Sequence, residues 1–329
     1  MSKMKKIKEP TQKIKVAKVE SALYRGAEKY FQQNKYTFVP SIPHIVDITG
    51  ACEDVDNLYS IDYHGQEAFL VQTGQTALEI LLTNGIKRAC CMIHSFRKEQ
   101  EADNRHLTEF PLVELEFTYN PKQDGFELLL DEVEKTIKSM ITEVLETEQE
   151  TLKELKVDTE KLKQILAEKF QRITYDEAVK IAGKEWGEDL NATDEQIIVH
   201  KNGNRPVFVM RYPEEIKFFN MQRNRKKPRI VNSSDLLLPH SGEAVGAAVR
   251  ECNYRLLLEK LKKSQMFKIL SKKGKTVEDF TFYLDAVKKN PVPHAGCGIG
   301  LARVTQFILG TTDIKQAITY PMNKETFAK

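Results

Sequence analysis

The chain has 329 residues and carries 50 lysines and arginines against 47 aspartates and glutamates, a net charge of +3. This balance gives no ground for inferring nucleic-acid binding, and no apolar run approaches the length of a membrane span. The five cysteines form no disulfide framework or zinc-binding pattern, and the N-terminus has no secretory signal. We therefore expect a cytoplasmic protein that does not enter a membrane.

The first segment, residues 1–20, is a lysine-rich N-terminal tail. We expect it to be solvated, with an RNA-binding arm as the alternative. Residues 21–329 are expected to form one catalytic domain. Its first predicted elements are a helix over 21–33, an extended segment over 37–46, a strand over 68–72 and a helix over 76–83.

A predicted hairpin follows, in which an apolar strand (89–93) leads through a charged loop to an alternating strand (113–117). In the second strand Val113, Leu115 and Phe117 alternate with two glutamates, as in a half-buried strand. The connection is longer than the two to five residues of an ordinary hairpin loop. This length suggests that the loop binds a ligand such as a triphosphate.

Residues 125–170 have leucine, isoleucine, glutamate and lysine at helical spacing. We expect a pair of surface helices there, whose charges form a solvated face. The remaining predicted elements are strands at 206–211 and 234–238, a helix at 250–263 and a last helix from about residue 300. Because strands and helices do not alternate regularly, the pattern favours an α+β fold with an antiparallel sheet flanked by helices.

Four separated segments carry polar groups that apolar patterning does not explain. The first is the hairpin loop with its closing strand, which contains, in order, Arg97, Glu99, Arg105, His106, Glu109 and Phe110. Arginine presents a planar fork that matches a phosphate, and an aromatic ring offers a face on which a purine stacks. A surface salt-bridge cluster is an equally good interpretation of this segment alone.

The second segment places Lys217 among large apolar residues, where a lysine either extends to water or pairs with a buried anion. In the third, the small residues Gly246, Ala247 and Ala248 lie between Glu243 and Arg250, which favours a substrate pocket with a metal ligand over close helix packing. The fourth segment is PHAGCGIGLARVT, residues 293–305. Its glycines fail the dinucleotide-binding spacing but would let a strand and helix approach a nucleotide.

These segments, in this order, resemble the catalytic core of class II aminoacyl-tRNA synthetases, and most closely the asparaginyl and aspartyl branch. The runs that carry the resemblance are FRKE with RHLTEF, YPEEIKFFNM, DLLLPHSGEAVGAAVRE and VPHAGCGIGLARV. The resemblance covers roughly residues 20–329. It implies the class II antiparallel sheet flanked by helices, a helical insertion near 125–170, a homodimer and an ATP-dependent ligase that uses Mg²⁺.

The resemblance also implies roles for individual residues. Arg97 and Arg303 would be catalytic, holding the α-phosphate and the far end of a bent ATP. The nucleotide contacts would further include Glu99, Arg105, His106, Phe110 and Glu243, with Glu243 as the magnesium ligand. The amino acid would be bound by Glu53, Gln75, Lys217 and Arg250.

Several departures from the family pattern bear on function. Ala247 and Ala248 stand where the branch has smaller or polar residues and are expected to narrow the pocket, and Ala302 replaces an acidic residue before Arg303. Only about twenty residues precede the expected catalytic core, so we expect no anticodon-binding OB-fold.

The leading hypothesis is ATP-dependent activation of asparagine or aspartate to an aminoacyl adenylate, with a tRNA 3′ end as the acceptor. One alternative is an asparagine synthetase that combines aspartyl adenylate with ammonia. Another is a non-catalytic paralogue that binds an amino acid or tRNA as a regulator.

Overall fold

The computed structural model of the chain describes residues 10–48, 55–100 and 103–327. The strands are β1 (Thr37–Phe38), β2 (Ile45–Val46), β3 (Ser60–Tyr63), β4 (Gln66–Leu70), β5 (Arg88–Phe96), β6 (Glu109–Thr118), β7 (Gln171–Thr174), β8 (Val207–Met210), β9 (Ser233–Leu238), β10 (Gly242–Val249) and β11 (His294–Gly300). The α-helices are α1 (Pro10–Gln33), α2 (Gln75–Thr83), α3 (Gly125–Thr147), α4 (Gln149–Glu154), α5 (Thr159–Ala167), α6 (Tyr175–Ala182), α7 (Ala192–Lys201), α8 (Tyr254–Lys263), α9 (Gln265–Lys272), α10 (Thr281–Lys289) and α11 (Leu301–Leu309). None of the helices in these ranges is long and apolar enough to cross a membrane.

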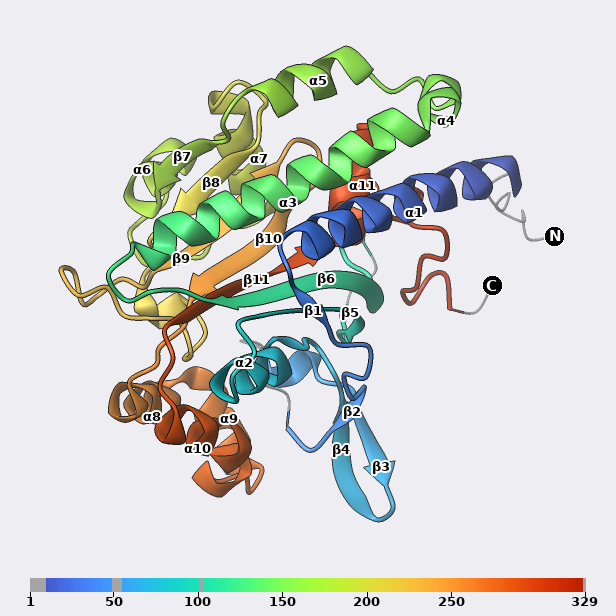
Figure 1. The fold of residues 1–329 in the computed structure, drawn as a ribbon. Coiled ribbons are helices and arrows are strands. Elements are labelled where there is room, and N and C mark those ends of the chain that lie inside the picture. Colours follow the sequence, from blue (N-terminus) through green and yellow to red (C-terminus); the bar gives the residue numbers. More distant parts are fainter. Residues whose placement is uncertain (1–9, 49–54, 101–102, 328–329) are drawn as a thin grey trace.

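An 8-stranded sheet with the order β1-β5-β6-β11-β10-β9-β8-β7 forms the centre of the fold (Figure 1). Its pairings are antiparallel except at the two edges, where β1 pairs with β5 and β7 with β8 in parallel. A separate 3-stranded sheet has the order β2-β4-β3. The predicted α+β fold, an antiparallel sheet flanked by helices, is therefore confirmed, as is the β5–β6 hairpin.

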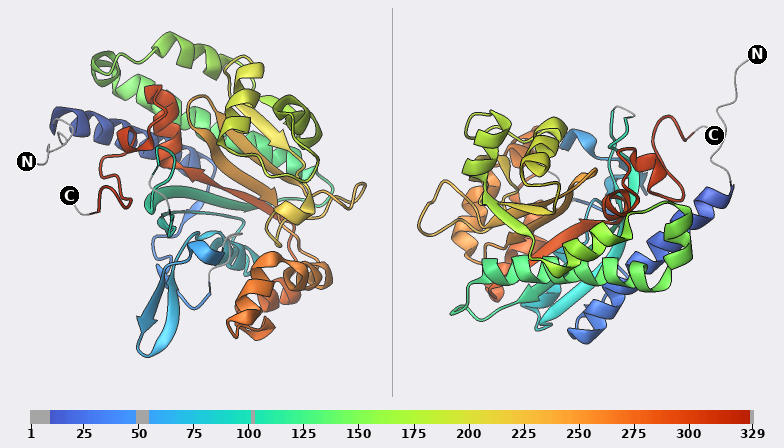
Figure 2. Two further views of the ribbon diagram at one scale, coloured as in Figure 1. Left: turned by 180° about the vertical axis from the view of Figure 1, so that it is seen from behind. Right: turned by 90° about the horizontal axis from the view of Figure 1, so that it is seen from above.

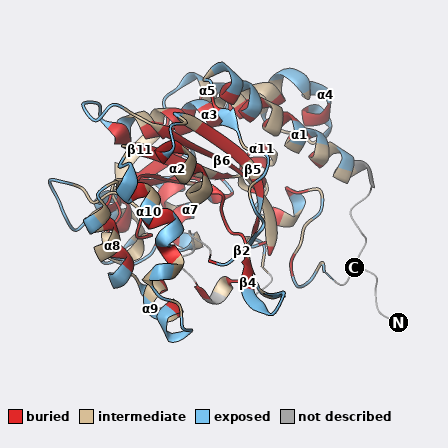
Figure 3. Cartoon of the chain, turned by 60° about the horizontal axis from the view of Figure 1, so that its bottom comes forward, coloured by how far each residue is buried: buried red, intermediate tan, exposed pale blue. Residues whose placement is uncertain are grey.

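At β9 the sheet is covered on both faces, because this strand carries apolar side chains on both sides. In β9, Leu236 and Leu238 pack in the cluster shared with α1, α3 and α11, whereas Leu237 packs against α6 and α7. Figure 2 shows α1 and α3 running side by side along one face. The buried residues concentrate in the strands and in the helix surfaces that face them (Figure 3).

Two expectations about the helices were wrong in detail. The first helix begins at Pro10, so half of the lysine-rich tail is part of α1, and Val16 and Val19 in this part are buried. Residues 125–170 form three helices instead of a surface pair. Of these, α3 is a core element whose Leu129, Val133 and Ile137 are fully buried.

Strand β10 is not predicted by the sequence pattern. The expected run of small residues followed by a helix from 250 is wrong: residues 242–249 are a central strand, and α8 begins only at Tyr254. The strand is buried on both faces, so its apolar residues do not alternate with polar ones.

Candidate active site

A cavity of about 720 Å³ lies between α2 and α7, with the central sheet strands contributing Glu114, Gly246 and Gly298 to its lining. The cavity brings together ten of the eleven predicted site residues from segments far apart in the chain. These are Gln75, Arg97, Glu99, Arg105, His106, Phe110, Lys217, Glu243, Arg250 and Arg303. The remaining residue, Glu53, lies outside the described residues.

One end of the cavity is strongly basic. Arg303, in the first turn of α11, donates to the carbonyl oxygens of Ser241 (2.6 Å) and Arg105 (2.8 Å). Burial, with the neighbouring Arg105, lowers the pKa of Arg303 to about 10. In the described part of the chain no carboxylate lies within ion-pair distance of Arg303 or of Arg97. Two arginines without acid partners favour an anionic ligand at this end.

Arg105 is held differently, by an ion pair to Glu195 of α7 at 2.7 Å. Glu195 also accepts from the backbone N–H of Glu243 and lies against Gly242, where a Cβ would come within 2.1 Å of its carboxylate. Gly242 has φ +71°, so a side chain there would be strained as well as obstructed. The β9–β10 turn thus joins α7 to the loop that carries Arg105.

The aromatic residue of the hairpin lies at the same end. Phe110 lines the cavity, and the Arg97 guanidinium lies 5.6 Å from the centre of its ring. His106 also lines the cavity, with its Nδ1 2.7 Å from Asp103. A flat apolar face beside two arginines has the composition of a purine nucleotide site.

Glu243 lines the cavity beside the buried carboxylate of Asp235. The charge of Asp235, together with burial, raises the pKa of Glu243 to about 8. No group of three or more metal-ligating side chains occurs among the described residues. Magnesium commonly uses only one or two carboxylates with substrate phosphates and water, so Glu243 next to a phosphate site fits such an ion.

The sequence left open whether Lys217 extends to water or pairs with a buried anion. Its Nζ lies 2.7 Å from Asp235 Oδ2 and 4.1 Å from the ring centre of Tyr212, and the two charged side chains are 11% and 8% exposed. The lysine is therefore paired with a buried anion and does not extend to water.

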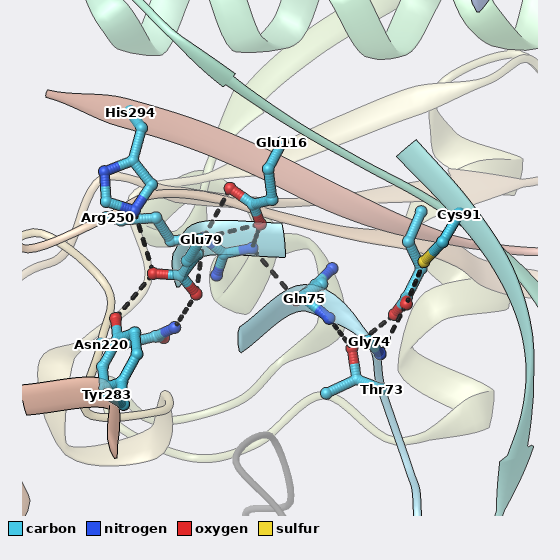
Figure 4. A network of polar contacts seen from close by, with 11 residues as sticks. Thr73, Gly74, Gln75, Glu79, Cys91, Glu116, Asn220, Arg250, Tyr283 and His294 are labelled. Carbon is cyan, nitrogen blue, oxygen red and sulfur yellow. Dashed lines mark hydrogen bonds and ion pairs between the residues drawn. The ribbon is translucent and has the colours of Figure 1, made fainter. Parts of the chain in front are cut away.

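The other end of the cavity is built around Arg250, whose side chain is 3% exposed. Its guanidinium donates to Glu116 Oε1 at 2.5 Å and to Gln75 Oε1 at 3.0 Å (Figure 4). Burial raises the pKa of Glu116 to about 7, although Arg250 opposes this shift. The positive charge of Arg250 is thus already balanced before any ligand binds.

Glu114 is a second buried carboxylate, and it lines the cavity. It accepts from the hydroxyl of Thr73 and from the N–H of Gly74 at 2.7 Å, while burial raises its pKa. In the part of the chain that the structure describes, no cation lies within 4 Å of it. Each carboxylate oxygen has further acceptor capacity, so Glu114 suits a ligand that donates hydrogen bonds.

The sequence interpretation missed Glu114 and Glu116, because their alternation with Val113 and Leu115 looked like the solvent side of a strand. Both glutamates are fully buried. The signal that could have found Glu116 lies in β11. A Cβ on Gly296 would come within 2.1 Å of Glu116, so this glycine makes room for the carboxylate.

The three alanines that depart from the family pattern differ in whether they reach the cavity. Ala247 and Ala302 line the cavity, whereas Ala248 is buried and does not reach it. Only Ala247, therefore, is placed to narrow the cavity from β10.

The antiparallel sheet flanked by helices is the fold of a class II synthetase catalytic domain, and its cavity holds arginines, the ring of Phe110 and the buried carboxylate of Glu114. A family model described as tRNA synthetases class II (D, K and N) matches residues 5–324, and the chain belongs to this family.

Similar proteins point to one member of that family. The chain is 33% identical to the asparagine–tRNA ligase of Desulforamulus reducens over 312 residues, covering 93% of this chain and 68% of the relative. It is 33% identical to the corresponding ligase of Streptococcus pneumoniae, with 94% and 68% covered. The crystal structure of asparaginyl-tRNA synthetase from Pyrococcus horikoshii complexed with asparaginyl-adenylate has a TM-score of 0.86 at 28% identity, covering 96% of this chain and 70% of that one.

Proposed function

We propose that this protein is an ATP-dependent ligase that activates asparagine to asparaginyl adenylate and transfers the asparaginyl group to the 3′ end of a tRNA. The observation that carries the proposal is the difference between the two ends of one cavity. At one end, Arg97 and Arg303 have no carboxylate within ion-pair distance among the described residues, and at the other Arg250 is paired with Glu116. The similarity to asparagine–tRNA ligases and to a synthetase complexed with asparaginyl-adenylate supports it.

The charge balance distinguishes asparagine from aspartate. Arg250 is already paired with Glu116, and Glu114 has no cationic partner among the described residues. A substrate carboxylate would add a negative charge next to both glutamates, in a site where burial makes repulsion costly. An amide can instead accept from Arg250 and donate to Glu114.

In the proposed reaction the asparagine carboxylate attacks the α-phosphorus of ATP in line, and pyrophosphate leaves. No protein nucleophile takes part; the protein positions the reactants and neutralises charge. Arg97, near Phe110, binds the α-phosphate while the ring stacks on adenine, and Arg303 binds the far end of ATP. Lys217 and Gln75 orient the amino acid. Glu243 would hold a magnesium ion together with the phosphates, and the ion would supply further neutralisation of the phosphate charge.

The proposal includes a homodimer in the cytoplasm. Its support is family membership and the position of β1 at the edge of the sheet, where the side chain of Phe38 is half exposed. Sedimentation velocity tests the dimer: a single species at the monomer mass would contradict it.

Amino-acid-dependent exchange of labelled pyrophosphate into ATP tests the activation step. Asparagine-driven exchange followed by charging of tRNA is the expected result. Aspartate-driven exchange that yields asparagine with ammonia would instead support the synthetase alternative. No exchange with either amino acid would favour the regulator.

A further inference from the structure

A buried polar cluster lies behind Arg250, and most of its residues lie outside the cavity lining. It consists of Glu79 of α2, Tyr283 of α10 and His294 of β11, each at most 1% exposed, together with Asn220, which also lines the cavity (Figure 4). Full burial of polar groups costs free energy unless hydrogen bonds compensate it. Each contact in this cluster therefore constrains where the protons lie.

The contacts of His294 require that the imidazole ring and the Glu79 carboxyl group share two protons. Nδ1 lies 2.6 Å from the carbonyl oxygen of Val292, which can only accept, so Nδ1 carries a proton. Nε2 lies 3.0 Å from Glu79 Oε2, and this contact also needs a proton. Either His294 is an imidazolium beside a carboxylate, or a neutral imidazole faces a protonated Glu79.

The other partners of Glu79 decide between these two states. Tyr283 donates its hydroxyl to Oε2 at 2.6 Å, and Asn220 Nδ2 donates to Oε1 at 2.9 Å. Donors on both oxygens stabilise the ionised carboxylate. Burial is the largest single cause for both groups and favours their neutral forms. It is outweighed for Glu79 by Arg250, His294 and Tyr283 together, which lower its pKa. For His294 it is outweighed by Glu79, Glu116 and the Val292 carbonyl together, which raise its pKa.

The imidazolium affects Arg250 through Glu79. Arg250 Nε lies 3.8 Å from Glu79 Oε1, farther than the 2.5 Å between the guanidinium and Glu116. Glu79 is already occupied by three donors, so it does not compete strongly for the arginine. Loss of the His294 proton would remove one donor and one positive charge, and Arg250 would be drawn from Glu116 and Gln75 towards Glu79.

We infer that His294 is a buried imidazolium that acts as a positioning residue: by occupying Glu79, it directs Arg250 towards Gln75 and the amino-acid end of the cavity. The inference rests on the proposed activation of asparagine only for its kinetic consequence. The charged and titratable groups around the imidazolium are Glu79 on α2, Tyr283 on α10, Glu116 on β6 and Arg250 beyond β10.

The protonation state is measured directly by ¹⁵N NMR of the protein labelled at histidine, with the signal assigned by His294→Gln. The expected spectrum has protons on both ring nitrogens at a pH above 6.5, the ordinary value for histidine. In Glu79→Gln the imidazolium signal should disappear at that pH. A neutral imidazole in the unmodified protein would overturn the inference, whether or not the protein is active.

The kinetic test compares His294→Gln with the exposed control His200→Gln. Glutamine can still donate to Glu79 but has no charge. We expect the KM for asparagine to rise about tenfold or more in His294→Gln, the effect of losing a charge-assisted hydrogen bond, with the KM for ATP unchanged. In the unmodified protein we expect the KM for asparagine to rise with pH as His294 loses its proton, and His294→Gln should lack this rise.

The two proposals fail in different ways. Absence of asparagine-dependent exchange in the unmodified protein contradicts the proposed function and leaves the NMR result to decide the charge of His294. Exchange that proceeds with an unchanged KM for asparagine in a folded His294→Gln variant contradicts the positioning role alone. A folded state is verified by circular dichroism for each variant.

Discussion

Gly296 of β11 lies directly opposite Glu116 of β6, and the glutamate occupies the space that a side chain on the glycine would need. A Cβ at Gly296 would lie 2.1 Å from the Glu116 carboxyl carbon. Because Glu116 holds the Arg250 guanidinium, one missing side chain on β11 sets the position of an arginine beyond β10.

Gly296→Ala should therefore displace Glu116 and impair asparagine binding. We expect the KM for asparagine to rise at least tenfold and the free energy of unfolding to fall by about 1–3 kcal/mol, as for overpacking of a core. Exchange kinetics and urea unfolding measure the two effects. Cys297→Ala, in the next residue of β11, is the control and should lower stability while leaving the KM for asparagine unchanged. Equal KM values for asparagine in both variants would contradict the view that Gly296 sets the position of Glu116 for asparagine binding.

Arg303→Ala should leave the fold intact and reduce pyrophosphate exchange by about 10²–10³-fold, as for loss of one preorganised electrostatic donor. Its guanidinium donates only to backbone carbonyl oxygens in the described structure, so its removal leaves no buried carboxylate uncompensated. The exposed Arg255→Ala serves as the control. Full exchange activity in Arg303→Ala would refute the proposed role of this arginine.

Lys217→Met should lower both stability and amino-acid affinity, because it leaves Asp235 buried beside Glu243 without its cation. Breaking a buried ion pair costs about 3–5 kcal/mol. Urea unfolding measures the loss, and Lys226→Met, at an exposed position, should change stability very little. A loss of less than 1 kcal/mol, on the scale of surface pairs, would show that the pair is effectively solvated.

Glu114→Gln should weaken the discrimination between asparagine and aspartate. The substitution removes the negative charge that opposes a substrate carboxylate and adds a donor that can bind it. We expect the ratio of kcat/KM for the two amino acids to fall about tenfold or more, equivalent to one hydrogen bond to a charged group. An unchanged ratio, measured by exchange at saturating ATP, would assign the discrimination to other residues.

The ion pair between His294 and Glu79 predicts a pH window for stability. The folded pKa of His294 is raised above 6.5, so its contribution is fully present below pH 6.5 and is lost as the pH rises through the folded value. The folded pKa of Glu79 is lowered below 4.5, so its contribution is fully present above pH 4.5 and is lost as the pH falls through the folded value. The stability difference between the unmodified protein and His294→Gln should therefore be largest between pH 4.5 and 6.5. A difference that grows above this range would contradict the assigned charge.

The sequence alone determined the elements with a regular period. The β5–β6 hairpin was predicted because Val113, Leu115 and Phe117 alternate with polar residues. The resemblance of separated motifs to one family selected ten residues that the fold brings into a single cavity. Agreement of several motifs in order is more informative than any one of them, since each alone also fits a surface salt-bridge cluster or a close packing of small residues.

Only the tertiary structure decided what surrounds those residues. Periodicity identifies the two faces of a strand, but it cannot tell whether the polar face meets water or a buried cavity. The alternation in β6 therefore suggests that Glu114 and Glu116 face water, whereas both are fully buried. For the same reason β10, buried on both faces, gave no alternating signal. The pairing of Arg250 with Glu116, and the contact of His294 with Glu79 behind it, join residues 134 and 215 positions apart. Contacts over such separations arise from the packing of the sheet against α2 and α10, and no local pattern in the chain records them.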